Sequence, residues 1–260
     1  MAQTMSRAVL FAETRPIFGG ALSQPQVDGI NAILDAWETH GDGTPRHLAY
    51  VLSTAKHETA STMQPVRETL AKTDAKAKER LTKAWKAGKL KVSRDYWSGG
   101  YFGRGFVQLT HKANYAKAGK ALGINLVGNP SLALDPAISA AIIIRGMLEG
   151  WFTGKKLADF PHDFVESRRI VNGTDKAVLI AGYAYRFLDA IEKAQAAVVI
   201  PPATPMPANP LPPRTDDPAG KDATSNVRGW LGIIILALSA IGAGIAVAWD
   251  WLSAFIERIF

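Results

Sequence analysis

Apolar residues recur at helical spacing through most of the first 197 positions. Thr44-Pro45 supplies a cap residue followed by proline at the first helical position, and apolar positions then repeat every three or four residues. Asp135-Pro136 repeats this device, and Thr110 precedes a run that ends at Gly123. Strand-like alternation is sparse, and the glycine-punctuated segment 98–109 is the best candidate for a small β-hairpin. The pattern predicts a mainly α-helical domain over 1–197.

The pattern changes after residue 197. Residues 201–218 hold eight of the fifteen prolines, a density that favours extended polyproline II, so 198–228 is predicted to be a linker. Residues 229–249 are all uncharged and would span roughly 31 Å as a helix, close to the thickness of bilayer hydrocarbon. We therefore predict a transmembrane helix over 229–249 and a short tail over 250–260.

Charge is concentrated in one stretch. The chain carries a net charge of +7, and residues 71–94 hold nine basic against two acidic side chains. Such a stretch is either a solvated helix face or a surface for an anionic polymer or lipid headgroups. Trp85 is the only aromatic residue in it, which argues against binding of single-stranded nucleic acid.

The motifs of several common enzyme classes are absent, which leaves carboxylates as the candidate catalytic groups. The sequence has no cysteine, no GxxxxGK[ST] loop, no HExxH and no GxSxG, and its five histidines do not have a metal-ligand spacing. No metal or cofactor is therefore expected.

Glu58 continues the apolar stripe of the helix from Pro45, where partial desolvation would raise its pKa and suit a general acid. Glu68 follows Pro65, at which the chain leaves that helix. A second carboxylate roughly 6.5–9.5 Å from the first would suit an inverting glycoside hydrolase. The alternatives are a solvated glutamate at 58 and a surface ion pair at 68.

Four segments resemble the family 19 glycoside hydrolases, which include plant-type chitinases and lysozyme-like bacteriophage endolysins. They are AKHETAS (55–61), PVRE (65–68), YFGRGFVQLTHKANY (101–115) and IVNGT (170–174). The resemblance runs over about residues 20–195 and is closer to the endolysins than to the cysteine-containing plant enzymes. It implies a lysozyme-like, two-lobed α-helical fold.

The resemblance also implies roles for individual residues. Glu58 matches the general acid and Glu68 the general base, and Thr110 matches the residue that helps to hold the attacking water. The positions that match sugar-contacting or cleft-lining residues are Gln108, Asn114, Tyr115, Asn172 and Arg186. The family's charged network near Asn172 is not reproduced clearly, because Asp175 and Lys176 occupy that region.

We therefore expect a membrane-anchored endolysin or muramidase that hydrolyses β-1,4 bonds of peptidoglycan with inversion. An endochitinase is the first alternative, because the same residues would cleave an N-acetylglucosamine polymer. The second is a membrane-tethered wall-binding protein without activity, against which the intact Glu58, Glu68 and Thr110 argue.

The charges around 229–249 predict a location. Arg214, Lys221 and Arg228 precede the segment, and only Arg258 follows it, so the positive-inside bias places the catalytic domain in the cytoplasm. The amino-terminal residues 1–16 do not resemble a secretory signal. We expect a single-pass, C-terminally anchored protein of the inner membrane that reaches the wall after a partner such as a holin permeabilises the bilayer.

Overall fold

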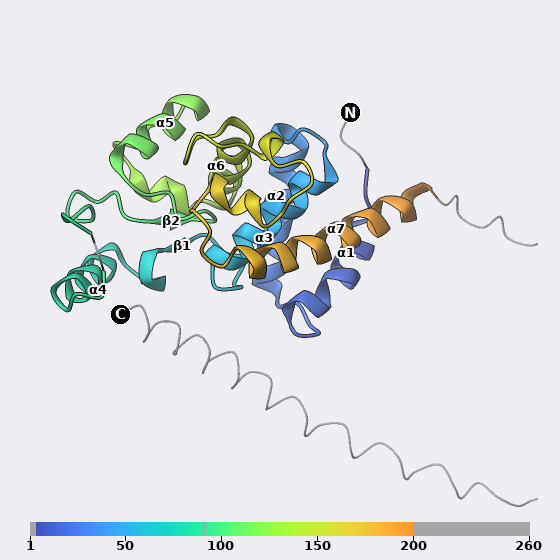
Figure 1. Ribbon diagram of the computed structural model, residues 1–260, viewed down its shortest axis with the longest axis horizontal. Helices are drawn as coiled ribbons and strands as arrows, with labels where there is room; N and C mark the ends of the chain where they lie inside the picture. The colour runs from blue at the N-terminus through green and yellow to red at the C-terminus, as the bar shows by residue number, and fades with distance from the viewer. Residues whose placement is uncertain (1–3, 91, 200–260) are drawn as a thin grey trace, which may run out of the picture.

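The computed structural model describes residues 4–90 and 92–199, and helices dominate them (Figure 1). In chain order the elements are α1 (Arg7–Thr14), η1 (Arg15–Phe18), α2 (Gln24–His40), α3 (Pro45–Glu58), β1 (Val66–Arg67), η2 (Glu68–Leu70), α4 (Asp74–Lys86), β2 (Arg104–Gly105), α5 (Lys112–Leu122), η3 (Pro130–Leu134), α6 (Pro136–Glu149), η4 (Leu157–Asp159), η5 (Glu166–Ile170) and α7 (Ala177–Val199). The prediction of a mainly α-helical domain is confirmed for the described residues.

The predicted transmembrane helix and tail, and nearly all of the predicted linker, lie outside the described residues. Within the part of the chain that the structure does describe, no helix is both long and apolar enough to cross a membrane.

Several helix boundaries follow the predicted punctuation. α3 begins at Pro45, and α6 begins after Asp135, whose carboxylate accepts a hydrogen bond from the backbone N–H of Ile138 at 3.0 Å. α5 ends at Gly123, which has a left-handed backbone (φ 70°), as glycine allows. Thr110 does not cap α5, because the cap position belongs to His111.

The described core is divided between two hydrophobic clusters, which define two lobes. The larger cluster includes residues of α2, α3, α6 and α7, and α3 packs against α7 while α2 packs against α6. The smaller cluster lies around α4, on the opposite side of the β-strands from α1 and α7 in Figure 1. Its buried members are Ala71, Ala77, Leu81, Trp97 and Phe102. We call residues 70–102 the α4 lobe.

The small sheet joins the two lobes and differs from the predicted hairpin. β1 and β2 are antiparallel, with Val66 opposite Gly105 and Arg67 opposite Arg104. Within 98–109 only an isolated bridge links Arg104 to Leu109, so the principal partner of this segment is β1, far away in the sequence. Gly105 has φ 86°, and a Cβ there would lie 2.6 Å from Oγ of Ser139 on α6. This close approach fixes β2 against the larger lobe.

Lys56 is an unusual member of the core because its ammonium group is buried. Its side chain is 5% exposed, with Nζ 2.7 Å from Oγ of Ser61 and 4.2 Å from the ring centroid of Tyr183. Among the described residues, no carboxylate forms an ion pair with it. Burial lowers the pKa of Lys56 to about 8.

The folded state should therefore gain stability from Lys56 as the pH rises. Between pH 8 and 10.5 the unfolded chain still binds a proton that folded Lys56 has released, so the free energy of unfolding increases by up to about 3 kcal/mol. Lys56→Met cannot show this gain. Urea denaturation of both proteins across this range measures the difference and cancels the effect of tyrosines that titrate in both. Parallel stability curves would contradict the assignment.

Candidate active site

Glu58 ends α3 with its carboxylate in an ion pair. Oε1 accepts a hydrogen bond from Nη1 of Arg168 at 2.8 Å, and the two side chains are 17% and 2% exposed. Arg168 also donates from Nε to the carbonyl oxygen of Asp175 at 3.0 Å. Burial lowers the pKa of His57, the residue before it, against the opposing effect of the Glu58 carboxylate. Glu58 therefore has a fixed cationic partner from a segment 110 residues away in the sequence.

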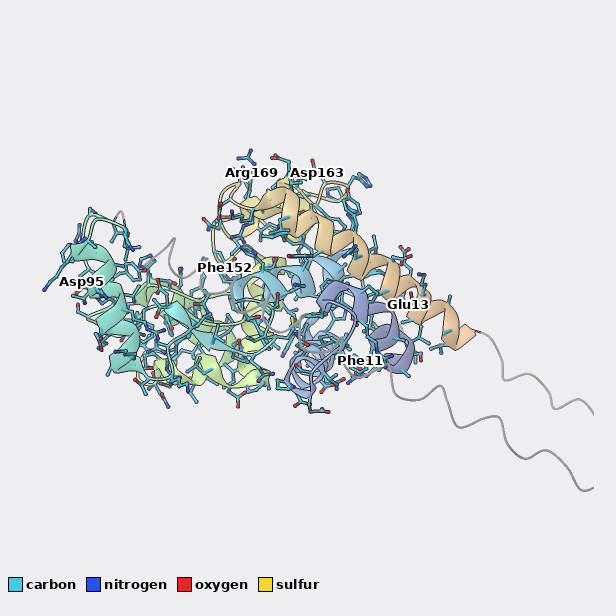
Figure 2. All side chains as sticks on the ribbon, turned by 90° about the horizontal axis from the view of Figure 1, so that it is seen from below. Phe11, Glu13, Asp95, Phe152, Asp163 and Arg169 are labelled. Atoms are coloured by element: carbon cyan, nitrogen blue, oxygen red, sulfur yellow. The ribbon has the colours of Figure 1, made fainter. Side chains whose placement is uncertain are left out.

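Sequence reasoning missed Arg168. It predicted Asn172 and Arg186 as residues that line the cleft. Arg168 is the arginine that contacts Glu58, and Arg186 lies exposed on α7. Asn172 is exposed too, and its backbone N–H donates to the carbonyl oxygen of Arg168 at 2.9 Å. The available signal was the Arg168-Arg169 pair just before IVNGT, but the sequence did not show which arginine faces inward. Arg169 lies outside, paired with Glu166 (Figure 2).

Glu68 is held by donors from the α4 lobe and the β2 segment. Tyr96 donates its hydroxyl hydrogen to Oε1, and the backbone N–H of Gly103 donates to Oε2 at 2.7 Å. Burial, together with the nearby Glu68 carboxylate, raises the pKa of Tyr96, so that its phenol remains a donor. The backbone N–H of Glu68 donates to the carbonyl oxygen of Gly103 at 2.7 Å. This orientation is not that of a surface glutamate paired with Arg67.

Three further predicted residues form a chain of contacts that begins beside Glu68. Gln108 lies with Glu68 against Gly103, since a Cβ added there would be 2.8 Å from Gln108 Oε1 and 3.3 Å from Glu68 Oε2. The hydroxyl of Thr110 donates to the carbonyl oxygen of Gln108 at 2.7 Å, and Asn114 Nδ2 donates to the carbonyl oxygen of Thr110 at 2.8 Å. The structure thus brings Glu68, Gln108, Thr110 and Asn114 together.

Tyr115 differs from these residues because it is completely buried. Its hydroxyl donates to the carbonyl oxygen of Phe102 at 2.8 Å and lies 3.0 Å from Nη1 of Arg104. The buried face of α5 carries Tyr115 with Ala118 and Gly119, which turns the ring into the core. The side chain has no exposed surface for a sugar, and its place in the structure is to support Arg104 instead of contacting a substrate.

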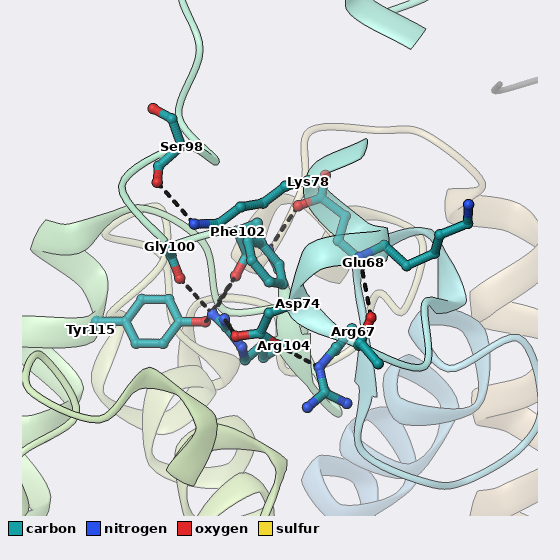
Figure 3. Close-up of polar contacts among 12 residues, drawn as sticks. Arg67, Glu68, Asp74, Lys78, Ser98, Gly100, Phe102, Arg104 and Tyr115 are labelled. Carbon is teal, nitrogen blue, oxygen red and sulfur yellow. Dashed lines mark hydrogen bonds and ion pairs between the residues drawn. The ribbon is translucent and has the colours of Figure 1, made fainter. Parts of the chain in front are cut away.

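Arg104 anchors the segment that carries Gly103 (Figure 3). It is 1% exposed, and its guanidinium donates to the carboxylate of Asp74 and to the carbonyl oxygen of Gly100, each at 2.7 Å. Asp74 also accepts from Nε of Arg67 at 2.6 Å, and these two arginines hold the pKa of Asp74 below its usual range, against the opposing effect of burial. The network joins α4, β1 and β2 directly beneath Glu68.

Backbone strain gathers around the same groups. Eight described residues other than glycine have a positive φ, and seven of them lie within 60–70 or 108–111. Thr69, next to Glu68, has φ 63°, which is rare for a β-branched residue. Such conformations cost about 1–3 kcal/mol each and cluster at functional sites. No group of three or more potential metal ligands occurs among the described residues.

Comparison with known proteins identifies the family. The family 19 glycoside hydrolase model, described as chitinase class I, matches residues 30–184. This is more than half of the chain, and the chain belongs to that family.

Chitinase 11 of Oryza sativa subsp. japonica is 38% identical over 78 residues, which are 30% of this chain and 29% of that protein. The basic 30 kDa endochitinase of Solanum lycopersicum is 37% identical over 78 residues, 30% and 23% of the two chains. The chain thus matches less than a third of the length of these relatives.

Solved structures of bacterial chitinases are also similar. Chitinase C from Streptomyces griseus HUT6037 has 21% sequence identity and a TM-score of 0.48, over 71% of this chain and 77% of that one. A second bacterial family 19 chitinase has 23% identity and a TM-score of 0.48, over 70% and 95% of the two chains.

Gly103 offers a direct test of how Glu68 is positioned. In Gly103→Ala the new methyl group would press on Gln108 and Glu68, so we expect glycoside hydrolase activity to fall about 10- to 100-fold. Gly99→Ala is the matched control, since its nearest neighbour would be Cδ2 of Tyr101 at an ordinary 3.7 Å. Initial rates of both variants are compared, with circular dichroism to verify folding. Equal rates would contradict the positioning role.

Proposed function

We propose that the chain hydrolyses β-1,4 glycosidic bonds of an N-acetylated cell-wall glycan with inversion at the anomeric carbon. The observation that carries this proposal is the different setting of the two carboxylates. Glu58 faces a buried guanidinium, whereas Glu68 is oriented by a phenol and a backbone N–H. A proton donor and a water activator supplied by separate elements are what the two-carboxylate mechanism requires.

In the proposed reaction Glu58 donates its proton to the leaving glycosidic oxygen. The bond between that oxygen and the anomeric carbon breaks, and Glu58 becomes a carboxylate. Nη1 of Arg168, 2.8 Å from Oε1, is placed to stabilise the negative charge that this step leaves on Glu58. Arg168 therefore favours the product side of the proton transfer.

On the opposite face of the sugar, Glu68 takes a proton from the attacking water. The hydroxyl hydrogen of Thr110 is engaged by the carbonyl oxygen of Gln108, so the oxygen of Thr110 acts as an acceptor. A water that donates one hydrogen to Thr110 and the other to Glu68 would direct its lone pair at the anomeric carbon. Glu68 and Thr110 thereby divide the work of deprotonating and orienting the water.

Within this reaction we favour peptidoglycan as the substrate, which would make the protein an endolysin or muramidase. The basic surface of the α4 lobe supports this choice, because peptidoglycan carries carboxylates on its peptides and chitin does not. Chitin is the second candidate, and it is supported by the names of the plant and bacterial relatives.

Removal of the proton donor tests the mechanism. Glu58→Gln should reduce hydrolysis by about 10²–10⁴-fold while preserving the fold, and Glu68→Gln should be similarly severe. Thr110→Ala should be milder, because other groups still hold the water. Glu166→Gln, the same change in an exposed ion pair, is the control. Reducing ends released from purified peptidoglycan and from colloidal chitin are measured for each variant. Near wild-type activity of Glu58→Gln would refute the assignment of the acid.

We further propose that residues 229–249 anchor the protein in the inner membrane with the catalytic domain on the cytoplasmic side. The uncharged run of 21 residues and the basic residues before it support this topology. Protease added to intact spheroplasts should leave the catalytic domain undigested until the bilayer is permeabilised, as a holin would do in the cell. Digestion of the domain without permeabilisation would overturn the orientation.

A further inference from the structure

The α4 lobe carries an excess of positive charge that the rest of the described chain does not share. In this lobe residues 71–94 hold nine basic and two acidic side chains, and Asp95 is a third acidic residue. The rest of the described chain holds 17 basic and 15 acidic residues. The imbalance therefore belongs to one lobe. Figure 2 shows this lobe, labelled at Asp95, at the opposite end of the molecule from Glu13 on α1.

The two acidic residues within 71–94 already form ion pairs. Asp74 pairs with Arg67 and Arg104, both from outside the stretch, and Glu79 pairs with Lys76 at 2.7 Å. Among the described residues, no carboxylate forms an ion pair with five exposed basic side chains of the lobe. They are Lys72, Lys83, Lys86, Lys89 and Arg94. Their charges are available to an external anion.

One of these charges, Arg94, lies close to the proposed base. A surface hollow is lined by residues 92–96 and His111, and thus brings Arg94 next to Tyr96, whose hydroxyl binds Glu68. A second, open hollow on α4 includes Lys78, Lys83 and Lys86 in its lining. A glycan that passes Glu68 would therefore come close to Arg94, and one that continues over the lobe would meet the lysines of α4.

The chemistry of this surface favours one class of ligand. The lobe has little exposed aromatic surface on which the bases of a nucleic acid could stack, because Trp85 is 39% exposed and Trp97 is buried. An unsubstituted N-acetylglucosamine polymer offers no charge to separated lysines and arginines. A glycan with peptide substituents presents carboxylates at intervals along its length, which suits separated cations.

We infer that the α4 lobe binds the carboxylates of the peptides attached to the glycan, and thereby selects peptidoglycan over chitin. This inference rests on the proposed glycan hydrolysis and names the part of the substrate, beyond the sugar chain, that the protein recognises.

The test is a quadruple variant that neutralises four of these five unpaired charges: Lys83→Gln, Lys86→Gln, Lys89→Gln and Arg94→Gln. A matched control removes three lysines and one arginine from exposed positions elsewhere: Lys120→Gln, Lys155→Gln, Lys156→Gln and Arg15→Gln. Full-length proteins are assayed on intact peptidoglycan and on soluble neutral chitin oligosaccharides.

On intact peptidoglycan the lobe variant should lose about tenfold in kcat/KM, mainly through KM, while the control stays within twofold of wild type. On the chitin oligosaccharides all three proteins should be equal. Raising the salt concentration from about 20 to 200 mM should remove the difference on intact peptidoglycan. An equal loss on all substrates, or no loss on intact peptidoglycan, would overturn the inference.

Binding separates this inference from the proposed activity. Co-sedimentation with intact peptidoglycan sacculi should fall for the lobe variant and not for the control, whether or not any protein is active. If binding follows this pattern but no glycan is cleaved, the proposed function fails and the recognition stands. If the lobe variant instead loses binding only to phosphatidylglycerol vesicles, the surface is a lipid contact and the inference is wrong.

Discussion

Burial of a guanidinium is the constraint on which the proposed acid depends. A charged group that is withdrawn from water must find partners inside the protein, because an unpaired buried charge is very costly. Arg168 is 2% exposed, and its partners are the carboxylate of Glu58 and the carbonyl oxygen of Asp175. The last turn of α3 and the segment around η5 are therefore held together at the point where Glu58 leaves the helix. The same contact that fixes the fold fixes the direction of the acid.

A second buried arginine, Arg104, positions the other carboxylate. Arg104 joins Asp74 at the start of α4 to the segment 100–105, and Gly103 in that segment donates its N–H to Glu68. Glu68 is thus positioned by backbone that is itself held by an ion pair between β2 and α4. The two carboxylates therefore depend on different arginines, which come from different segments of the chain.

Local signals in the sequence were sufficient for much of the fold and for part of the site. Thr44-Pro45 and Asp135-Pro136 predicted helix starts because caps and proline act over a few residues. Glu58, Glu68, Gln108 and Thr110 were found through short motifs. Three features depended on contacts between distant segments and could not be read locally: the pairing of β2 with β1, the inward orientation of Arg168, and the burial of Tyr115. In each case the deciding partner lies elsewhere in the chain, so periodicity and spacing carry no information about it.

The stereochemistry of hydrolysis tests the central claim most directly. If Glu68 activates a water on the face opposite to the leaving group protonated by Glu58, each bond is cleaved in one displacement, and the new reducing end first appears as the α-anomer. Proton NMR of the first minutes of hydrolysis, before mutarotation, records this product. An initial α-anomer is the result that the account predicts. An initial β-anomer would show retention and would contradict the assignment of Glu68 as a base acting on water.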